Sequence, residues 1–446
     1  MTKRSSPAGP EHPGGDLEPG SVRVTVADSE RRGLSRGVRI GVIALAAVLS
    51  SAGVLIGARL VGGAQAQSRA PDADRVTRQT GSSADEGGPV PGSTRLALLG
   101  PLVLLDSRGT GAFRPGAEVS LSLPVLPPGT TAVALEVSLL EAAGPGAVTV
   151  GSDAGQVTVL RVARAKAMST ATAMIRVGPD DQLRIQTDGG GHLLVNLVGA
   201  LEPVDASRSG RIVPVPATQV LRLVPKREGN DAIIDPASVP ALREAGSVSA
   251  VLLQFAADVG RNGGSVAVGT SANRLDQHVF WSATTGDDRT RSGFLVVPLL
   301  DGSVHVTYHA GSLLTVDLVG YVTGADAPRS AAGLVVPTRP AAAQSAKVAA
   351  GATVDVTLLP LAAVNAVPAD RMAGALVGVS AVGDAVGGVS VYAPDSPPPS
   401  TPILTAAAGA PRQALTLARA VGGVVRVGSA SGASVSLLPQ AFIVSG

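Results

Sequence analysis

The sequence contains no cysteine, which excludes disulfide scaffolds, cysteine-ligated zinc or iron–sulfur sites and thiol nucleophiles. Aromatic residues make up only 2% of its 446 residues and charged residues only 16%, against roughly 25% charged residues in an average soluble protein. This scarcity disfavours a cofactor-dependent enzyme or a DNA-reading protein. Apolar residues still amount to 45%, so the chain has enough apolar surface to fold and is not disordered throughout.

Glycine and proline are abundant instead, with 55 and 33 residues, as expected for short strands joined by turns. Apolar and polar residues alternate in short stretches such as 119–123 and 304–308, which predicts half-buried strands. No stretch combines capping residues with a sustained helical period. We therefore predict that the chain beyond residue 95 is all-β.

One uncharged apolar run of 19 residues, 40–58, is long enough to cross a membrane as a helix. Four arginines precede it: Arg31, Arg32, Arg36 and Arg39. Their position predicts a cytoplasmic N-terminus and an extracytoplasmic body. A buried core helix is the alternative. We predict an uncleaved signal anchor over 40–61, whereas cleavage after Ala66 would make the body a secreted protein.

The segments on either side of the anchor, 1–39 and 62–95, are rich in proline, glycine, serine and charge. They are predicted to form a disordered cytosolic tail and an extracytoplasmic stalk. The first 63 residues hold eight of the 36 basic and five of the 34 acidic residues, so the rest of the chain is nearly neutral. A nearly neutral body argues against nucleic acid as a partner, and the oligomeric state stays open.

The body repeats one pattern three times. A strand, a glycine-containing turn and a second alternating strand begin at Ala132, Ala250 and Gly374, and we interpret each as a β-hairpin. A closing strand follows in each copy, and its alignment places Asn196, Asp317 and Ser436 at equivalent positions, 121 and 119 residues apart.

The repeat predicts three tandem antiparallel β-sandwich domains behind one N-terminal transmembrane helix. Their expected bounds are 96–204, 211–324 and 333–446, and the short connections predict close packing of neighbours. A closed barrel is the alternative for each copy.

Four short motifs resemble those of a known family. They are LLDSRG at 104–109, VALEV at 133–137, VNLVG at 195–199 and VDLVGY at 316–321. They are similar to a secreted tandem repeat domain of actinobacteria that has a Leu-Leu-Asp-Thr-Arg-like opening and an Asp-Val-Val-Gly-Tyr-like closing strand. The resemblance implies an extracytoplasmic location and no settled activity. This chain departs from the pattern, because copy two has VPK at 224–226 in place of the Asp/Arg element and copy three has no counterpart.

Two groups of residues are candidates for ligand contact. Asp106 and Arg108 could bind a ligand together; the alternative is a turn closed by a local ion pair. Trp281 precedes Asp287 and Asp288, and a ring beside carboxylates is typical of carbohydrate-binding sites. The alternative for Trp281 is a place in an aromatic-poor core.

The body carries four histidines: His192, His278, His305 and His309. His192 flanks a glycine turn. On a strand, His305 and His309 would stand about 13 Å apart, too far to chelate one ion. No nucleophile elbow, P-loop, dinucleotide fingerprint or zinc-protease motif occurs. We therefore predict no catalytic residue, no cofactor and no metal site.

These observations predict a membrane-anchored, extracytoplasmic, non-catalytic structural or binding protein of the cell envelope. Its expected partners are cell-wall polymers or other envelope proteins. The first alternative is a signalling or assembly subunit whose tail reports on an extracytoplasmic sensing body. The second is a cell-wall hydrolase with a triad assembled from residues distant in sequence.

Overall fold

The computed structural model describes residues 38–39, 90–224, 230–259, 263–282, 290–300, 302–309, 311–339, 342–409 and 411–446. The predicted membrane span and most of the predicted tail and stalk lie outside these ranges. The two-residue strand β1 (Val38–Arg39) pairs in parallel with Val119 and Ser120. Within the described ranges, no helix is both long and apolar enough to cross a membrane.

The described body consists almost entirely of strands, as predicted. Copy one contains β2 (Thr94–Asp106), β3 (Ala117–Ser122), β4 (Ala132–Leu140), β5 (Gly146–Ser152), β6 (Gly155–Val162), β7 (Ser169–Arg176), β8 (Gln182–Thr187) and β9 (His192–Pro203). Copy two contains β10 (Ile212–Leu223), β11 (Asp231–Ile234), β12 (Val248–Asp258), β13 (Gly264–Gly269), β14 (Gln277–Trp281), β15 (Thr290–Pro298), β16 (Val304–His309) and β17 (Leu313–Thr323).

Copy three has its first strand in two pieces and adds a short helix. Its strands are β18 (Val335–Pro337), β19 (Gln344–Val348), β20 (Ala352–Thr357), β21 (Met372–Gly383), β22 (Gly387–Tyr392), β23 (Leu404–Ala406), β24 (Arg412–Arg419), β25 (Val424–Ser429) and β26 (Ala433–Val444). The described helices, which the sequence patterns did not indicate, are η1 (Pro236–Ser238), α2 (Pro240–Ala245), α3 (Leu359–Val364) and η2 (Ala369–Arg371).

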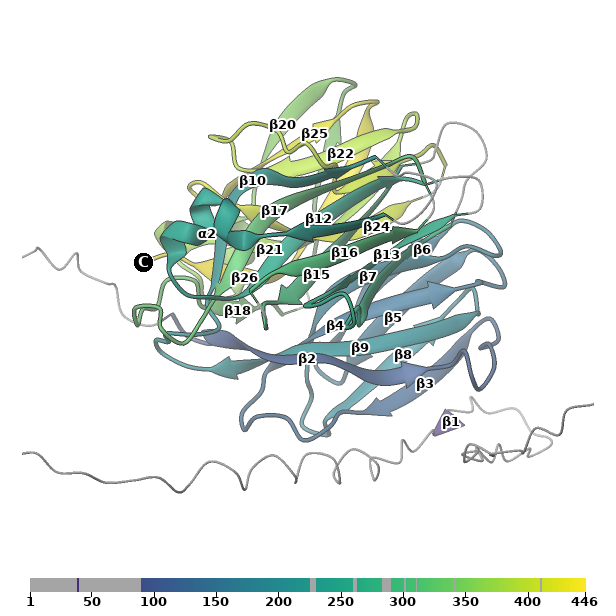
Figure 1. The fold of residues 1–446 in the computed structure, drawn as a ribbon, viewed down its shortest axis with the longest axis horizontal. Helices are drawn as coiled ribbons and strands as arrows, with labels where there is room; N and C mark the ends of the chain where they lie inside the picture. The colour runs from purple at the N-terminus through teal and green to yellow at the C-terminus, as the bar shows by residue number, and fades with distance from the viewer. Residues whose placement is uncertain are drawn as a thin grey trace, which may run out of the picture. The chain divides into compact units, whose positions relative to one another are not determined.

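The strand pairings repeat in the same order in all three copies (Figure 1). In copy one, β2-β9-β4-β7 form one sheet and β3-β8-β5-β6 the other; copies two and three follow the same order. The first, eighth, third and sixth strands of a copy thus form one sheet, and the second, seventh, fourth and fifth form the other. Two separate sheets with this order make a jelly roll, which is a β-sandwich rather than the closed barrel considered as the alternative.

The predicted hairpin at the start of each repeat is wrong. Strands β4 and β5 follow each other in the chain, but β4 pairs with β7 and β9 whereas β5 pairs with β6 and β8. The same holds for β12 and β13 and for β21 and β22. The glycine-containing turn is therefore a corner between two sheets. Alternating strands around a glycine fit a hairpin and a corner equally well.

The closing strands also differ from the predicted alignment in one copy. The ladders place Asn196 and Asp317 at equivalent positions, as predicted, but Leu438 and not Ser436 is their counterpart in copy three. A shift of two residues keeps every side chain on the same face of a strand. The alternation of apolar residues therefore could not reveal the shift.

Each copy has its own apolar core between its two sheets. A fourth apolar cluster contains only residues from the first, third, sixth and eighth strands of all three copies. We call these three sheets the inner sheets and the others the outer sheets. Because an inner sheet is covered on both faces, its central strands are mostly apolar: all nine residues of β4 are buried, including Glu136 and Ser138.

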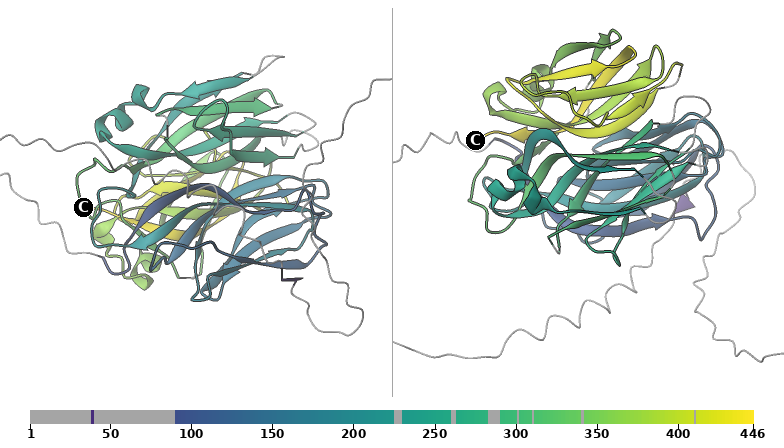
Figure 2. Two further views of the ribbon diagram at one scale, coloured as in Figure 1. Left: turned by 60° about the horizontal axis from the view of Figure 1, so that its bottom comes forward. Right: turned by 45° about the horizontal axis from the view of Figure 1, so that its top comes forward.

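The inner sheets bring the copies together as a pseudo-trimer within one chain. Strands β7, β15 and β24, the sixth strand of each copy, contact one another pairwise. Pairing also continues between copies, from Trp281 of β14 to Ser169 of β7 and from Val335 of β18 to Thr94 of β2. The described residues from 90 onward belong to one compact unit, and Figure 2 shows its copies in blue, in teal to green and in light green to yellow.

The two linkers between copies use the same glycine geometry. Gly210 and Gly333 have φ angles of 79° and 85°. Their carbonyl oxygens accept the backbone N–H groups of Leu96 and Ile212, both at 2.7 Å. A Cβ on Gly210 would lie 2.6 Å from the carbonyl oxygen of Leu96, so the conformation and the close approach both require glycine.

Candidate functional site

Asp106 and Arg108 form a local ion pair at the end of β2. Arg108 Nη2 lies 2.5 Å from Asp106 Oδ2, and the backbone N–H of Arg108 donates to Asp106 Oδ1 at 3.0 Å. The hydrogen bond from the guanidinium lowers the pKa of the Asp106 carboxyl, and the carboxylate in turn raises the pKa of Arg108. Both carboxylate oxygens are thus engaged inside the turn. This is the turn closed by a local ion pair that the sequence analysis gave as the alternative to a ligand site.

Ser107 and His192 lie next to this pair but do not form a nucleophile and its base. The Ser107 side chain is fully buried, and its Oγ accepts the backbone N–H of Leu193 at 2.9 Å. His192 Nδ1 lies 3.1 Å from the carbonyl oxygen of Ser107. The imidazole therefore contacts the backbone of Ser107 and not its hydroxyl.

Trp281 is the last residue of β14 and belongs to the core of copy two. Its side chain is only 2% exposed, and its Nε1 donates to the carbonyl oxygen of Ser292 at 3.2 Å. A ring packed in this way does not offer a face for stacking on a sugar. Asp287 and Asp288, the other residues of this candidate site, lie outside the described residues.

The other histidines are on strands of copy two. His305 and His309 are both on β16, as the predicted separation assumed. His278 is on β14, where its ring stacks on Phe280 with 5.6 Å between the ring centroids, and burial lowers its pKa. The described part of the chain holds no group of three or more histidines and acids that could bind a metal ion.

A buried carboxyl group lies between copies one and two. Glu136 of β4 is 1% exposed, and its Oε1 accepts the Asn196 side-chain amide at 3.3 Å and the backbone N–H of His278 at 3.4 Å. Its Oε2 is buried with no hydrogen-bond partner. Loss of hydration on burial disfavours the charged form, which raises the pKa of Glu136 to about 7.

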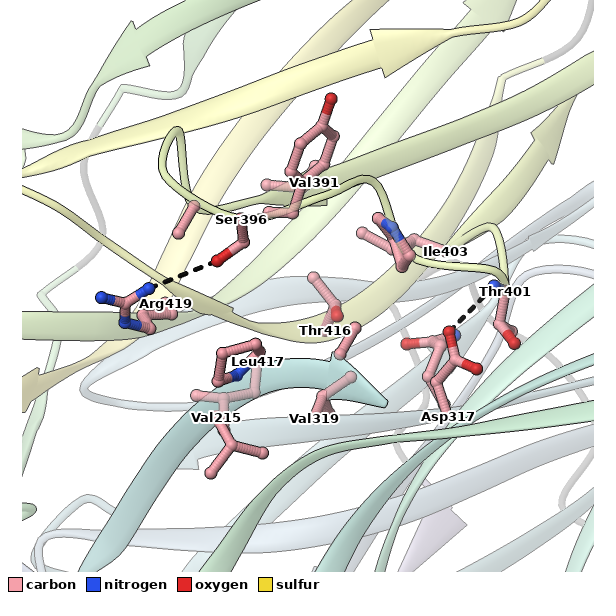
Figure 3. Close-up of a pocket in the computed structure, with 16 residues that line it drawn as sticks. Val215, Asp317, Val319, Val391, Ser396, Thr401, Ile403, Thr416, Leu417 and Arg419 are labelled. Atoms are coloured by element: carbon pink, nitrogen blue, oxygen red, sulfur yellow. Dashed lines mark hydrogen bonds between the residues drawn. The ribbon is translucent and has the colours of Figure 1, made fainter. Parts of the chain in front are cut away.

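A second buried carboxyl group lies between copies two and three. Asp317 of β17 is 0% exposed; its Oδ1 accepts the hydroxyl of Ser400 at 2.6 Å and its Oδ2 accepts the backbone N–H of Thr401 at 2.9 Å. We call the contact region between two copies a seam. Figure 3 shows Asp317 and Thr401 at one end of the seam between copies two and three and Arg419 and Ser396 at the other. The open space between them is about 20 Å³, room for about one water molecule. The seam is therefore closed to a larger ligand.

The third seam, between copies three and one, is built differently. The ladder positions of Glu136 and Asp317 are taken in copy three by Gly378 and Leu438. One polar contact here comes from Gln413 of β24, which donates to the carbonyl oxygen of Thr158 in copy one.

Two further hydrogen bonds cross between copies. Thr172 Oγ1 donates to the carbonyl oxygen of Phe294 at 2.6 Å, and the backbone N–H of Met174 donates to Gln440 Oε1 at 2.8 Å. The buried polar groups of the inner sheets thus hold one copy against the next.

Sequence reasoning did not select Glu136 or Asp317 as site residues, although a signal was present. Each acid interrupts an otherwise apolar run, AVALEVSLL at 132–140 and LLTVDLVGYV at 313–322. A carboxyl group in a strand that is buried on both faces needs hydrogen-bond partners from outside its own sheet. Such an interruption could have indicated a contact between copies.

Comparison with known proteins gives little for this chain. No family model matches it, and no curated protein matches it either. One similar solved chain comes from the study "Life in the extremes: atomic structure of Sulfolobus Turreted Icosahedral Virus". It is 13% identical, with a TM-score of 0.17, over 80% of this chain and 91% of that chain. A likeness at this TM-score carries no argument about the fold or the function.

Proposed function

We propose that the chain is a membrane-anchored, extracytoplasmic protein of the cell envelope that binds or spaces envelope components without catalysing a reaction. The observation that supports this most is the use of its buried acids. Glu136 and Asp317 accept hydrogen bonds across the seams between copies, so these carboxyls serve the assembly of the body. The exposed pair Asp106 and Arg108 closes its own turn.

The sequence supports the location. The uncharged run 40–58 and the arginines before it favour an anchor with the body outside. The nearly neutral body favours contact with polymers or proteins of low charge rather than with nucleic acid.

The orientation can be tested with epitope tags before Met1 and after Gly446 in cells whose wall has been removed. External protease should destroy the C-terminal tag and spare the N-terminal one. Replacing Arg31, Arg32, Arg36 and Arg39 by glutamate is the matched control, because it removes the charge asymmetry and should scramble the protection pattern. Protection of the C-terminal tag in the unaltered chain would overturn the proposed location.

The partner can be tested by crosslinking the full-length chain in intact cells and analysing what is retained. We expect cell-wall polymer or another envelope protein; a chain that retains neither would contradict the binding role. Deletion of residues 2–30 separates this proposal from the signalling alternative, because it removes most of the tail but keeps the four arginines. Crosslinks and envelope phenotype should survive this deletion if the tail carries no signal.

A further inference from the structure

Exposed aliphatic residues gather where the first strand of copy one meets copy two. Leu99, Leu102 and Val103 of β2 are 39%, 42% and 58% exposed, and Leu300, just after β15, is 60% exposed. Residues 98–103 of β2 read LLGPLV and include no polar side chain. We call Leu99, Leu102, Val103 and Leu300 the β2 patch.

A pocket of about 200 Å³ lies beside the β2 patch. Leu98 and Pro101 of β2 line it, and so does Leu300 from copy two. The equivalent pocket between copies two and three has a volume of only about 20 Å³. Tyr392, the last residue of β22, lines that smaller pocket, whereas β13 ends in Gly269, which lines the larger one. The seam between copies one and two is therefore open beside the patch.

Polar side chains in the wall of this pocket are engaged by the protein itself. Ser249 and Gln277 donate to backbone carbonyl oxygens, both at 3.0 Å. Arg274 Nε lies 3.1 Å from Asp276 Oδ2, so these two side chains together carry no net charge. A mainly apolar wall with paired polar groups suits an aliphatic group better than a charged ligand.

Copy two shows that the fold does not require aliphatic residues at these positions. The ladders place Leu102 and Val103 where copy two has Thr218 and Gln219, which are also exposed. Polar residues of this kind protect an exposed strand from unwanted contacts. An exposed apolar patch in their place is typical of a surface that another component covers.

The position of the β2 patch in the chain favours the membrane as that component. The described body begins at residue 90, four residues before β2, so the strand that carries the patch is the one joined to the predicted stalk. A linker with the 31 residues of 59–89 would span about 30 Å on average, and such a tether raises the effective concentration of the patch at the bilayer. Binding energy between proteins comes mostly from tryptophan, tyrosine and arginine, whereas the patch contains only leucine and valine.

We propose that the β2 patch and the pocket beside it contact the membrane surface, where lipid acyl chains cover their aliphatic side chains. The inference rests on the proposed membrane anchor, because the anchor supplies the tether that makes a small apolar contact sufficient. A body held in this way lies against the bilayer instead of standing away from it on its stalk.

The test uses the full-length chain, whose lack of cysteine lets one introduced cysteine carry a single fluorophore. Leu99→Cys is labelled with the environment-sensitive dye NBD and reconstituted in vesicles of phosphatidylcholine and phosphatidylglycerol with brominated acyl chains. We expect blue-shifted emission that the bromine atoms quench. Val382→Cys is the matched control, because Val382 is a strand residue of copy three with a similar exposure of 37%; its label should report water and stay unquenched.

A label at Leu49→Cys, within the apolar run 40–58, separates failure of this inference from failure of the proposed function. Quenching at residue 49 with none at residue 99 overturns the inference and leaves the anchor in place. No quenching at either residue overturns the anchor and the inference with it. Blue-shifted emission at residue 99 without quenching shows that protein covers the patch, either a second copy or another segment of this chain, and overturns the assignment to lipid.

Leu102→Thr combined with Val103→Gln introduces the residues of copy two and keeps the labelled position. Loss of two aliphatic side chains removes apolar area from the contact, so the label at Leu99→Cys should lose its quenching. The unfolding temperature should change little because both side chains are exposed. Val386→Thr, at a valine of copy three that is 43% exposed, should leave the quenching unchanged. Quenching that survives the double substitution overturns the assignment of the contact to the β2 patch.

Discussion

Asp317 in copy two accepts the backbone N–H of Thr401 in copy three at 2.9 Å, 84 residues further along the chain. Its other oxygen accepts the hydroxyl of Ser400, so both oxygens of this buried carboxylate are hydrogen-bonded. In the seam between copies one and two, Oε1 of Glu136 accepts hydrogen bonds and Oε2 has no hydrogen-bond partner. The two seams use the same kind of group but satisfy it differently, and they should respond differently to substitution.

Asp317→Leu introduces the residue that copy three has at the equivalent position. It leaves the Thr401 N–H and the Ser400 hydroxyl without an acceptor, so we expect a loss of about 2–4 kcal/mol in the free energy of unfolding. Asp317→Asn can still accept the Thr401 N–H, while the Ser400 hydroxyl turns to accept from the new amide, and should cost less than Asp317→Leu. Urea unfolding followed by circular dichroism measures both. Asp326→Leu, at an exposed acid of the second linker, should change stability by less than about 0.5 kcal/mol; equal losses at 317 and 326 would contradict the role of the seam.

Glu136 should make the protein less stable as the pH rises. Its pKa in the folded state is about 7, above the ordinary value near 4.3 in the unfolded chain. The folded state therefore binds more protons between these values, so the contribution is fully present below about pH 4 and is lost as the pH rises through 7. The full loss amounts to about 4 kcal/mol.

Glu136→Gln tests this because the amide cannot ionise. The variant should be more stable than the parent at pH 8 and should lack the decline between pH 4 and 7 in unfolding experiments. Glu118→Gln, at an exposed position on β3, should keep the decline. If the parent chain and Glu136→Gln had the same free energy of unfolding at every pH, ionisation of Glu136 would not destabilise the folded state and the prediction would be wrong.

Gly210→Ala should destabilise the body by about 1–3 kcal/mol. The alanine would have to hold a φ of 79° and place its Cβ 2.6 Å from the carbonyl oxygen of Leu96. Gly109→Ala is a close control, since an added Cβ there has no atom within 4 Å and the φ is not in the left-handed region. Thermal unfolding of the two variants gives the comparison, and similar values would refute the argument from geometry.

The Asp106–Arg108 pair should contribute little to stability. Its side chains are 33% and 52% exposed, and exposed ion pairs contribute about 0.2–1 kcal/mol. A double-mutant cycle with Asp106→Asn and Arg108→Gln measures the coupling. Because the pKa of Asp106 is lowered in the folded state, the coupling should be present at neutral pH and vanish as the pH falls through that lowered pKa. Coupling much larger than this at pH 7 would indicate a role beyond closing the turn.

The strand content and the threefold repeat could be predicted from the sequence because both depend on the pattern of residues within short stretches. The alternating stretches 119–123 and 304–308 lie in or at the end of β3 and β16, and the mostly apolar stretch 133–137 is part of an inner strand. The order of the strands could not be predicted in the same way. A turn such as Gly144-Pro145-Gly146 leads to a neighbouring strand in a hairpin and to the opposite sheet in a jelly roll, with the same residues.

The candidate site shows the same division. Asp106 and Arg108 are two residues apart, and turn chemistry was enough to describe their contact. In the neighbouring copies, Glu136 and Asp317 have partners 142 and 84 residues away, so these contacts depend on how whole copies pack. Trp281 is followed in the sequence by charged residues, which suggested a ligand site. In the structure its side chain packs in the core of copy two.

An assembly of three identical chains would repeat any substitution at each of its interfaces. In this chain the three interfaces are encoded separately. One has an acid with one hydrogen-bonded oxygen, one has an acid with both oxygens hydrogen-bonded, and one has glycine and leucine at those positions. In an alkaline medium, ionisation of Glu136 should weaken the joint between copies one and two.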